Sequence, residues 1–182
     1  PSRPAQPGTA KLGDFKEIVG AESEGQLIIG IFDSAQLYKD SEVPQAVASG
    51  AVEMGTASLT RFAGTIPAVD FFYVPFSLPT LDAVRAATAP DGKVRGLLDD
   101  AILETGARVL WWQAVGGAVF MSDKELRLPS DVEGMKVRVF GKTLGDFVEL
   151  LGGAPALISG SEQFLAYQRG TVDAGMSSAA GV

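Results

Sequence analysis

The 182-residue sequence contains no cysteine and no histidine, and these two absences remove much of enzyme chemistry. Without cysteine the chain has no thiol nucleophile and no disulfide, and without histidine it has no Ser-His-Asp triad. Zinc sites built on cysteine or histidine are excluded for the same reason. Carboxylate-based mechanisms are not excluded, but the sequence predicts no metal site and no cofactor.

Long apolar runs are also missing. The longest apolar stretch, AVDFFYVPFSLP at residues 68–79, carries an aspartate and two prolines and is far shorter than a membrane-spanning helix. The chain does not open with the basic and apolar pattern of a signal peptide. We therefore expect a mature soluble protein, or a fragment of one, that does not insert into the membrane.

Positive charge is scarce, with 15 basic residues against 22 acidic ones and a net charge of −7. No block of like charge occurs, which argues against binding to a nucleic-acid backbone. An anionic ligand would need a local positive site. With 46% hydrophobic residues, the chain can bury a core as one ordinary domain or two small ones.

Apolar periodicity predicts alternating helices and strands. Two apolar runs, GQLIIGIF at 25–32 and ARVLWW at 107–112, are typical of buried strands. Helical spacing of apolar residues predicts helices that start near Thr9 and cover residues 81–89, 94–102 and 144–151. Alternation of this kind indicates an α/β fold with mostly parallel sheets.

The segment GMKVRVFGKT at 134–143 combines a predicted strand with a predicted helix start. Alternation along the strand would place Val137 and Val139 in a core and Lys136, Arg138 and Phe140 on the opposite face. On this pattern alone a solvated face is the ordinary interpretation for Arg138, because most charges on alternating strands are exposed.

The turn Gly141-Lys142-Thr143 resembles the end of a phosphate-binding Walker loop. That loop also needs a glycine five positions before Gly141, where the chain has Lys136. An α/β enzyme acting on a phosphorylated or nucleotide substrate through this turn is therefore the alternative function. Thr143 could cap the following helix, with Asp146 three residues on, and free backbone N–H groups would then favour an anion near Arg138.

An ungapped internal repeat relates residues 41–58 to residues 161–178 at a constant offset of 120 positions. Each copy predicts a Ser-capped helix, a glycine stop and a short strand. A duplicated α/β unit implies two lobes with a ligand held between them. We expect the aromatic residues Tyr73, Phe76 and Trp112 at or near the seam between the lobes.

Four long segments resemble the DctP-type solute-binding proteins of tripartite ATP-independent periplasmic (TRAP) transporters. They are AQLYKDSEVPQAVASGAVEMG, VDFFYVPF, LPSDVEGMKVRVFG and GGAPALISGSEQFLAYQRGTVDAG, in the family's order. The resemblance implies a non-catalytic, periplasmic protein whose signal peptide has been removed. It also implies a small organic acid as ligand and the TRAP membrane subunits as partner.

The same resemblance implies a two-lobed periplasmic-binding-protein-like clamp, incomplete at the C-terminus and at the N-terminus. We expect lobe I at residues 1–115, a partial lobe II at 116–182 and a crossover near 114–117. In this family the arginine of the K-x-R-V strand, here Arg138, pairs with the ligand carboxylate, which reverses the ordinary interpretation of its charge. The full set of expected ligand-binding residues is Arg138, Phe140, Gly141, Thr143, Ser58, Arg61, Tyr73, Phe76 and Ser177.

Two segments depart from some relatives. Apolar Val119 and Phe120 stand in a strand where some relatives carry a second arginine, and Ser177 stands near a position where some carry asparagine. These departures predict an acid that is smaller or less polar than a sugar acid.

Overall fold

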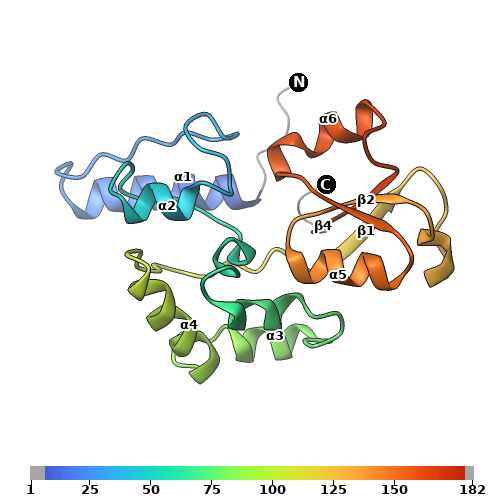
Figure 1. Cartoon of the computed structure of the whole chain (residues 1–182). Coiled ribbons are helices and arrows are strands. Elements are labelled where there is room, and N and C mark those ends of the chain that lie inside the picture. The colour runs from blue at the N-terminus through green and yellow to red at the C-terminus, as the bar shows by residue number, and fades with distance from the viewer. Residues whose placement is uncertain (1–6, 179–182) are drawn as a thin grey trace.

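The computed structural model describes residues 7–178, which form helices and one β-sheet (Figure 1). The first part of the chain contains α1 (Pro7–Glu22), α2 (Val43–Ala48), η1 (Leu59–Phe62), η2 (Pro67–Tyr73), α3 (Leu81–Ala87) and α4 (Lys93–Glu104), where η denotes a 3-10 helix. The second part contains β1 (Ala118–Ser122), η3 (Pro129–Val132), β2 (Lys136–Val139), α5 (Lys142–Leu150), β3 (Ala154–Leu157), η4 (Gly160–Glu162), α6 (Gln163–Gln168) and β4 (Ala174–Ser178). None of these described helices combines the length and the hydropathy needed to cross a bilayer.

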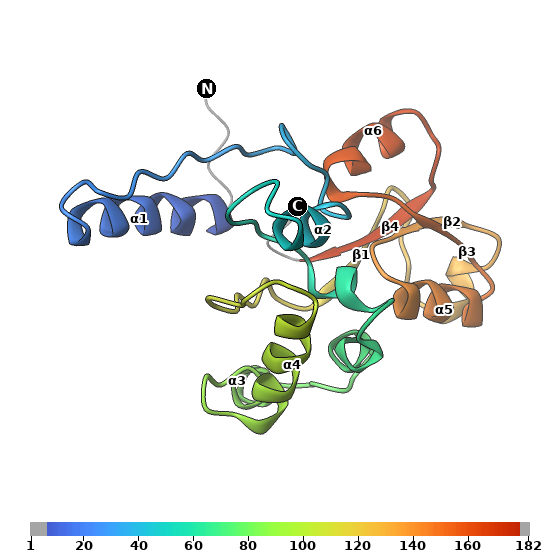
Figure 2. The same ribbon diagram turned by 60° about the vertical axis from the view of Figure 1, so that its left-hand side comes forward.

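The sheet has the strand order β1-β4-β2-β3. Strand β2 runs parallel to both of its neighbours, and β1 is an antiparallel edge strand beside β4. Helices α5 and α6 lie on opposite faces of this sheet (Figure 2). The sheet begins at Ala118, next to the expected crossover at 114–117, and the exact lobe boundary stays a prediction.

The alternation predicted for β2 is confirmed. Val137 and Val139 are buried against Leu144 and Val148 of α5, because residues two apart on a strand share one face. Helix α5 itself follows the predicted apolar spacing from residue 144 onward. A separate apolar cluster forms the core of the first part, where η2 packs on α4. Its buried members are Ile66, Val69, Leu98 and Ile102.

The two strands predicted in the first part of the chain are wrong. Residues 25–32 and 107–112 form neither helix nor strand, and Ile28 and Leu110 are exposed. A strand is defined by hydrogen bonds to a neighbouring strand, and within residues 7–178 neither segment has such a neighbour. An apolar run alone therefore predicted burial that these segments do not have.

The helix and the glycine turn of the internal repeat are confirmed, but its serine caps are wrong and only one copy forms its strand. The N-cap residues are Glu42 and Glu162, and neither makes a side-chain cap hydrogen bond. Helices α2 and α6 are each six residues long and lie 120 positions apart, and Gly50 and Gly170 follow them with positive φ angles of 74° and 62°. The turn bonds also match, since Ala51 N–H donates to the Ala46 carbonyl and Thr171 N–H to the Ala166 carbonyl, each at 2.9 Å. Only the second copy continues into a strand, β4.

Two leucines of α5 provide a test of the core. Leu144 is 2% exposed and Leu150 is 85% exposed, although both lie on the same helix. Leu144→Ala should lower the free energy of unfolding by about 2–5 kcal/mol, because it leaves a cavity between α5 and the sheet. Leu150→Ala should change it by less than about 0.5 kcal/mol. Urea denaturation of both variants measures the difference, and equal effects would contradict the packing of α5 described here.

Candidate functional site

Arg138 is a charged residue buried inside the sheet. Its position on β2 turns it away from Val137 and Val139, yet its side chain is only 3% exposed. The guanidinium reaches both neighbouring strands: Nε donates to the Ile158 carbonyl just after β3 at 2.9 Å, and Nη1 donates to the Met176 carbonyl of β4 at 2.6 Å. These two bonds fix the arginine across three strands.

The charge of Arg138 has no carboxylate in direct contact among residues 7–178. Burial lowers the pKa of its guanidinium, because the charged form loses its water. An arginine pKa is normally so far above neutrality that the group stays protonated. The site therefore presents a desolvated positive charge whose hydrogen-bond partners among residues 7–178 are neutral carbonyls.

Aromatic and hydroxyl groups from the first part of the chain meet the end of β2. The Phe140 ring lies under the Arg138 guanidinium, with 5.3 Å from the Arg138 Cζ to the ring centroid, and Tyr73 packs edge-on against Phe140 at 6.0 Å. The Tyr73 and Ser58 hydroxyls are 3.3 Å apart, and the Thr60 hydroxyl donates to the Phe140 carbonyl at 2.9 Å. Burial raises the pKa of Tyr73. Segment 58–73 thus joins the two parts of the chain at this point.

Arg61 lies in the same region and is paired with Asp40. Its Nε donates to Asp40 Oδ2 at 2.5 Å, and the other carboxylate oxygen of Asp40 accepts the Ser58 N–H at 3.0 Å. The Arg61 side chain is only 10% exposed. We call the residues around Arg138 and the Asp40–Arg61 pair the arginine site. Its members are Asp40, Ser58, Thr60, Arg61, Tyr73, Arg138 and Phe140.

The expected cap of α5 is wrong. Gly141, not Thr143, is the N-cap residue, with an extended backbone and no side-chain cap, and Thr143 lies in the first turn of the helix. Asp146 instead accepts a 2.6 Å bond from the exposed Lys142 ammonium, one helical turn before it. Gly141 is needed for close approach, since a Cβ there would lie 2.8 Å from Thr60 Cγ2.

Tyr167 and Gly175 support Arg138 from the α6 face of the sheet. Gly175 is the register partner of Arg138, and the Tyr167 hydroxyl occupies the space where a Gly175 side chain would be. Within residues 7–178 this buried hydroxyl has no hydrogen-bond partner. Burial raises the pKa of Tyr167, and the nearby Arg138 charge lowers it by a smaller amount. Ser177, two residues further along β4, is buried on the same face.

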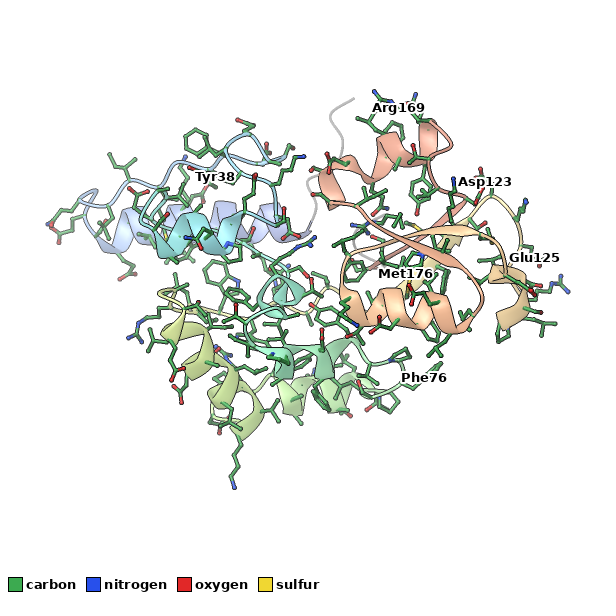
Figure 3. All side chains as sticks on the ribbon, in the orientation of Figure 1. Tyr38, Phe76, Asp123, Glu125, Arg169 and Met176 are labelled. Atoms are coloured by element: carbon green, nitrogen blue, oxygen red, sulfur yellow. The ribbon has the colours of Figure 1, made fainter. Side chains whose placement is uncertain are left out.

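Two of the expected seam aromatics are not among the rings that pack around Phe140 and Arg138, and their place at the seam stays a prediction. Phe76 is 89% exposed and projects from the loop after η2, below α5 (Figure 3). Trp112 packs in the core of the first part, where its indole N–H donates to Asp99 at 2.7 Å. The structure therefore brings Tyr73 to Arg138 but does not bring Phe76 or Trp112 there.

Four contributors were not predicted from the sequence: Asp40, Thr60, Tyr167 and Gly175. Asp40 pairs with Arg61 across 21 positions, a separation that no helix or strand period connects. Thr60 lies between Ser58 and Arg61, which were both expected at the site, so its position there could have been predicted from them. Gly175 matches Gly55 across the repeat offset of 120 positions, and this repeated glycine was the available signal.

Two hollows in the described residues are lined by no member of the arginine site, although the second borders Ile158, whose carbonyl accepts from Arg138. One of about 460 Å³ lies between the start of η2 and the end of α4, and one of about 270 Å³ lies beside α6. Arg138 lines neither of them. A buried charge that no carboxylate of residues 7–178 neutralises, as at Arg138, is the stronger sign of ligand binding.

Comparison with known families gives a match over nearly the whole chain. The model of the family described as "Bacterial extracellular solute-binding protein, family 7" (DctP) matches residues 3–180. The C4-dicarboxylate-binding periplasmic protein DctP of Rhodobacter capsulatus is 30% identical over 176 residues, which are 95% of this chain and 51% of that protein. The chain thus spans about half the length of this relative.

Solved structures of TRAP solute-binding proteins share the fold. The protein from Sulfurospirillum deleyianum with bound succinate superposes with a TM-score of 0.90 at 26% identity, over 97% of this chain and 57% of that one. DctP6 of Bordetella pertussis, a receptor binding pyroglutamic acid, gives a TM-score of 0.85 at 26% identity, over 93% and 56%. The expected α/β fold of periplasmic solute-binding proteins is therefore confirmed.

Gly175→Ala should disturb the support of Arg138. The new methyl group would overlap the Tyr167 hydroxyl and press on the Arg138 Cβ, so we expect a loss of about 1–3 kcal/mol in unfolding free energy. The loss should be smaller in a Tyr167→Ala background, which removes the overlapping group.

Gly64→Ala is the matched control, because nothing lies within 4 Å of a Cβ at that position. Urea denaturation of the four members of the Tyr167/Gly175 cycle measures the coupling. An equal cost of Gly175→Ala in both backgrounds would show that Tyr167 is not the obstructing group.

Proposed function

The chain belongs to family 7 of the bacterial extracellular solute-binding proteins, and from this membership we propose that it captures a small organic acid and delivers it to a TRAP membrane transporter. The family is one of solute-binding proteins and not of enzymes. Periplasmic location is part of the same proposal. Relatives with bound succinate and pyroglutamic acid support the class of ligand.

The observation that carries the proposal is the buried charge of Arg138. A desolvated cation is costly unless an anion pairs with it, and no carboxylate of residues 7–178 does so. A ligand carboxylate supplies the missing partner, and the planar guanidinium can bind it through two parallel hydrogen bonds. Ser58, Tyr73 and Phe140 would then line the ligand beside it.

The alternative function, catalysis on a phosphorylated or nucleotide substrate through residues 141–143, has no support in this geometry. Thr60 packs over Gly141, and the Lys142 ammonium points outward to Asp146. A Walker lysine must instead point into the loop to reach the phosphates. A ligand contact with the backbone N–H groups of Gly141 and Thr143 stays a prediction.

Arg138 variants test the proposed function. A thermal-shift screen of succinate, malate, pyroglutamate and glucuronate, with ATP as the nucleotide comparison, identifies an acid that binds. A bound acid should stabilise the protein by about 2.7 kcal/mol at a hundredfold excess over the dissociation constant. Calorimetric titration of that acid should then show about tenfold or greater weakening in Arg138→Ala, since a hydrogen-bonded buried charge pair is broken.

Two further variants sharpen this experiment. Arg138→Lys should restore binding only in part, because lysine keeps the charge and loses the planar pair of donors. Arg85→Ala is the control, because Arg85 lies exposed on α3 and pairs with the exposed Asp82. Unchanged affinity in a folded Arg138→Ala protein, checked by circular dichroism, would contradict the proposal.

A further inference from the structure

The number of charged side chains in the arginine site indicates how many negative charges its ligand carries. Asp40 and Arg61 join the site through printed contacts: they pair with each other, and Asp40 also accepts the Ser58 N–H. The Ser58 hydroxyl lies 3.3 Å from that of Tyr73, which packs against Phe140 under the Arg138 guanidinium. Two positive charges and one negative charge therefore share this small region, which leaves a single positive charge in excess.

The negative charge is already committed to Arg61. Asp40 accepts from Arg61 with one carboxylate oxygen and from the Ser58 N–H with the other, so its position is fixed from two sides. The pair is partly buried, with 10% of the Arg61 side chain and 31% of the Asp40 side chain exposed. Arg61 is thus neutralised by Asp40, whereas no carboxylate of residues 7–178 pairs with Arg138.

The cation beside Asp40 in the sequence is already paired, since Lys39 Nζ lies 2.8 Å from Glu162 Oε1. Strand β1, with the sequence AVFMS, contains no basic residue, and Ser177 of the adjacent β4 offers only a hydroxyl. Tyr73 and Tyr167 are neutral at physiological pH, because burial raises the pKa of both phenols. A second ligand carboxylate would therefore meet a neutral pair in which the Asp40 side chain is more exposed than that of Arg61.

We propose that the arginine site selects a monoanionic acid: one carboxylate bound by Arg138, and uncharged polar groups facing the Asp40–Arg61 pair. This inference rests on the proposed function, namely capture of an organic acid. Family membership does not decide the point, because one relative holds the dicarboxylate succinate and another binds pyroglutamic acid, which has a single carboxyl group. Asp40 supplies the repulsive element that such discrimination needs.

Matched acids that differ by one charge test the selection. Succinamate replaces one carboxylate of succinate with an amide, and D-glucuronate differs from D-glucarate in the same number of charges at equal carbon count. Calorimetric titration of the wild-type protein should show that, in whichever pair of acids binds, the monoanion binds about tenfold or more tightly than the dianion. The reason is that a second carboxylate brought close to Asp40 in a desolvated site is repelled.

Asp40→Asn should reduce or reverse this preference. The amide oxygen can still accept a hydrogen bond from Ser58, while the loss of the negative charge frees Arg61 to bind a second carboxylate. Asp123→Asn removes the same charge from an exposed position at the far end of β1 (Figure 3) and should leave the preference unchanged.

Each outcome decides a different claim. Equal or tighter binding of the dianion by the wild-type protein would overturn the monoanion inference and leave the proposed function standing. A folded wild-type protein that binds no member of either pair, and no acid of the thermal-shift screen, would overturn both. The wild-type comparison does not depend on Asp40→Asn folding. If that variant folds, a preference that it leaves unchanged would also count against the inference.

Discussion

The rest of the site depends on burying the Arg138 charge on a central strand. Desolvation of a guanidinium is unfavourable, and two backbone carbonyls replace only part of the lost water. Because those carbonyls belong to the segments on either side of β2, the arginine can be held only where three parallel strands run side by side. The same requirement explains the glycine opposite Arg138 on β4, since a larger residue would displace Tyr167 against the arginine.

The first part of the chain completes this site with few contacts. Segment 58–73 contributes a hydroxyl that binds the Phe140 carbonyl and an aromatic ring that packs against Phe140. Asp40 then fixes Arg61 and the start of η1 from outside. These are polar and edge contacts between two separate apolar cores. Such an arrangement suits a ligand that binds between the two parts, because its own groups can supply contacts that the protein lacks.

The periodicity of the sequence predicted those features of the structure that depend on neighbouring residues alone. The period of two placed Val137 and Val139 in the core, and the 3.6-residue period located α4 and α5. The pattern failed where a partner far along the chain decides the outcome. Residues 25–32 are apolar enough for a buried strand but have no neighbouring strand within the described chain. The importance of Arg138 came from family resemblance, because alternation alone placed its charge in solvent, and no spacing rule links Asp40 to Arg61.

The internal repeat shows, within one molecule, which features depend on local sequence and which depend on partners far along the chain. Both copies form a helix of equal length and an equivalent glycine turn, and in both a backbone N–H of the turn returns to the buried alanine at the centre of the helix. Only residues 174–178 become a strand, because β1 and β2 lie on either side of them, whereas residues 54–58 lack such neighbours in the described chain. That difference creates the asymmetry of the site. The second copy supplies the Met176 carbonyl that holds Arg138, and the first copy, free of a ladder, turns Ser58 toward Tyr73 and Asp40.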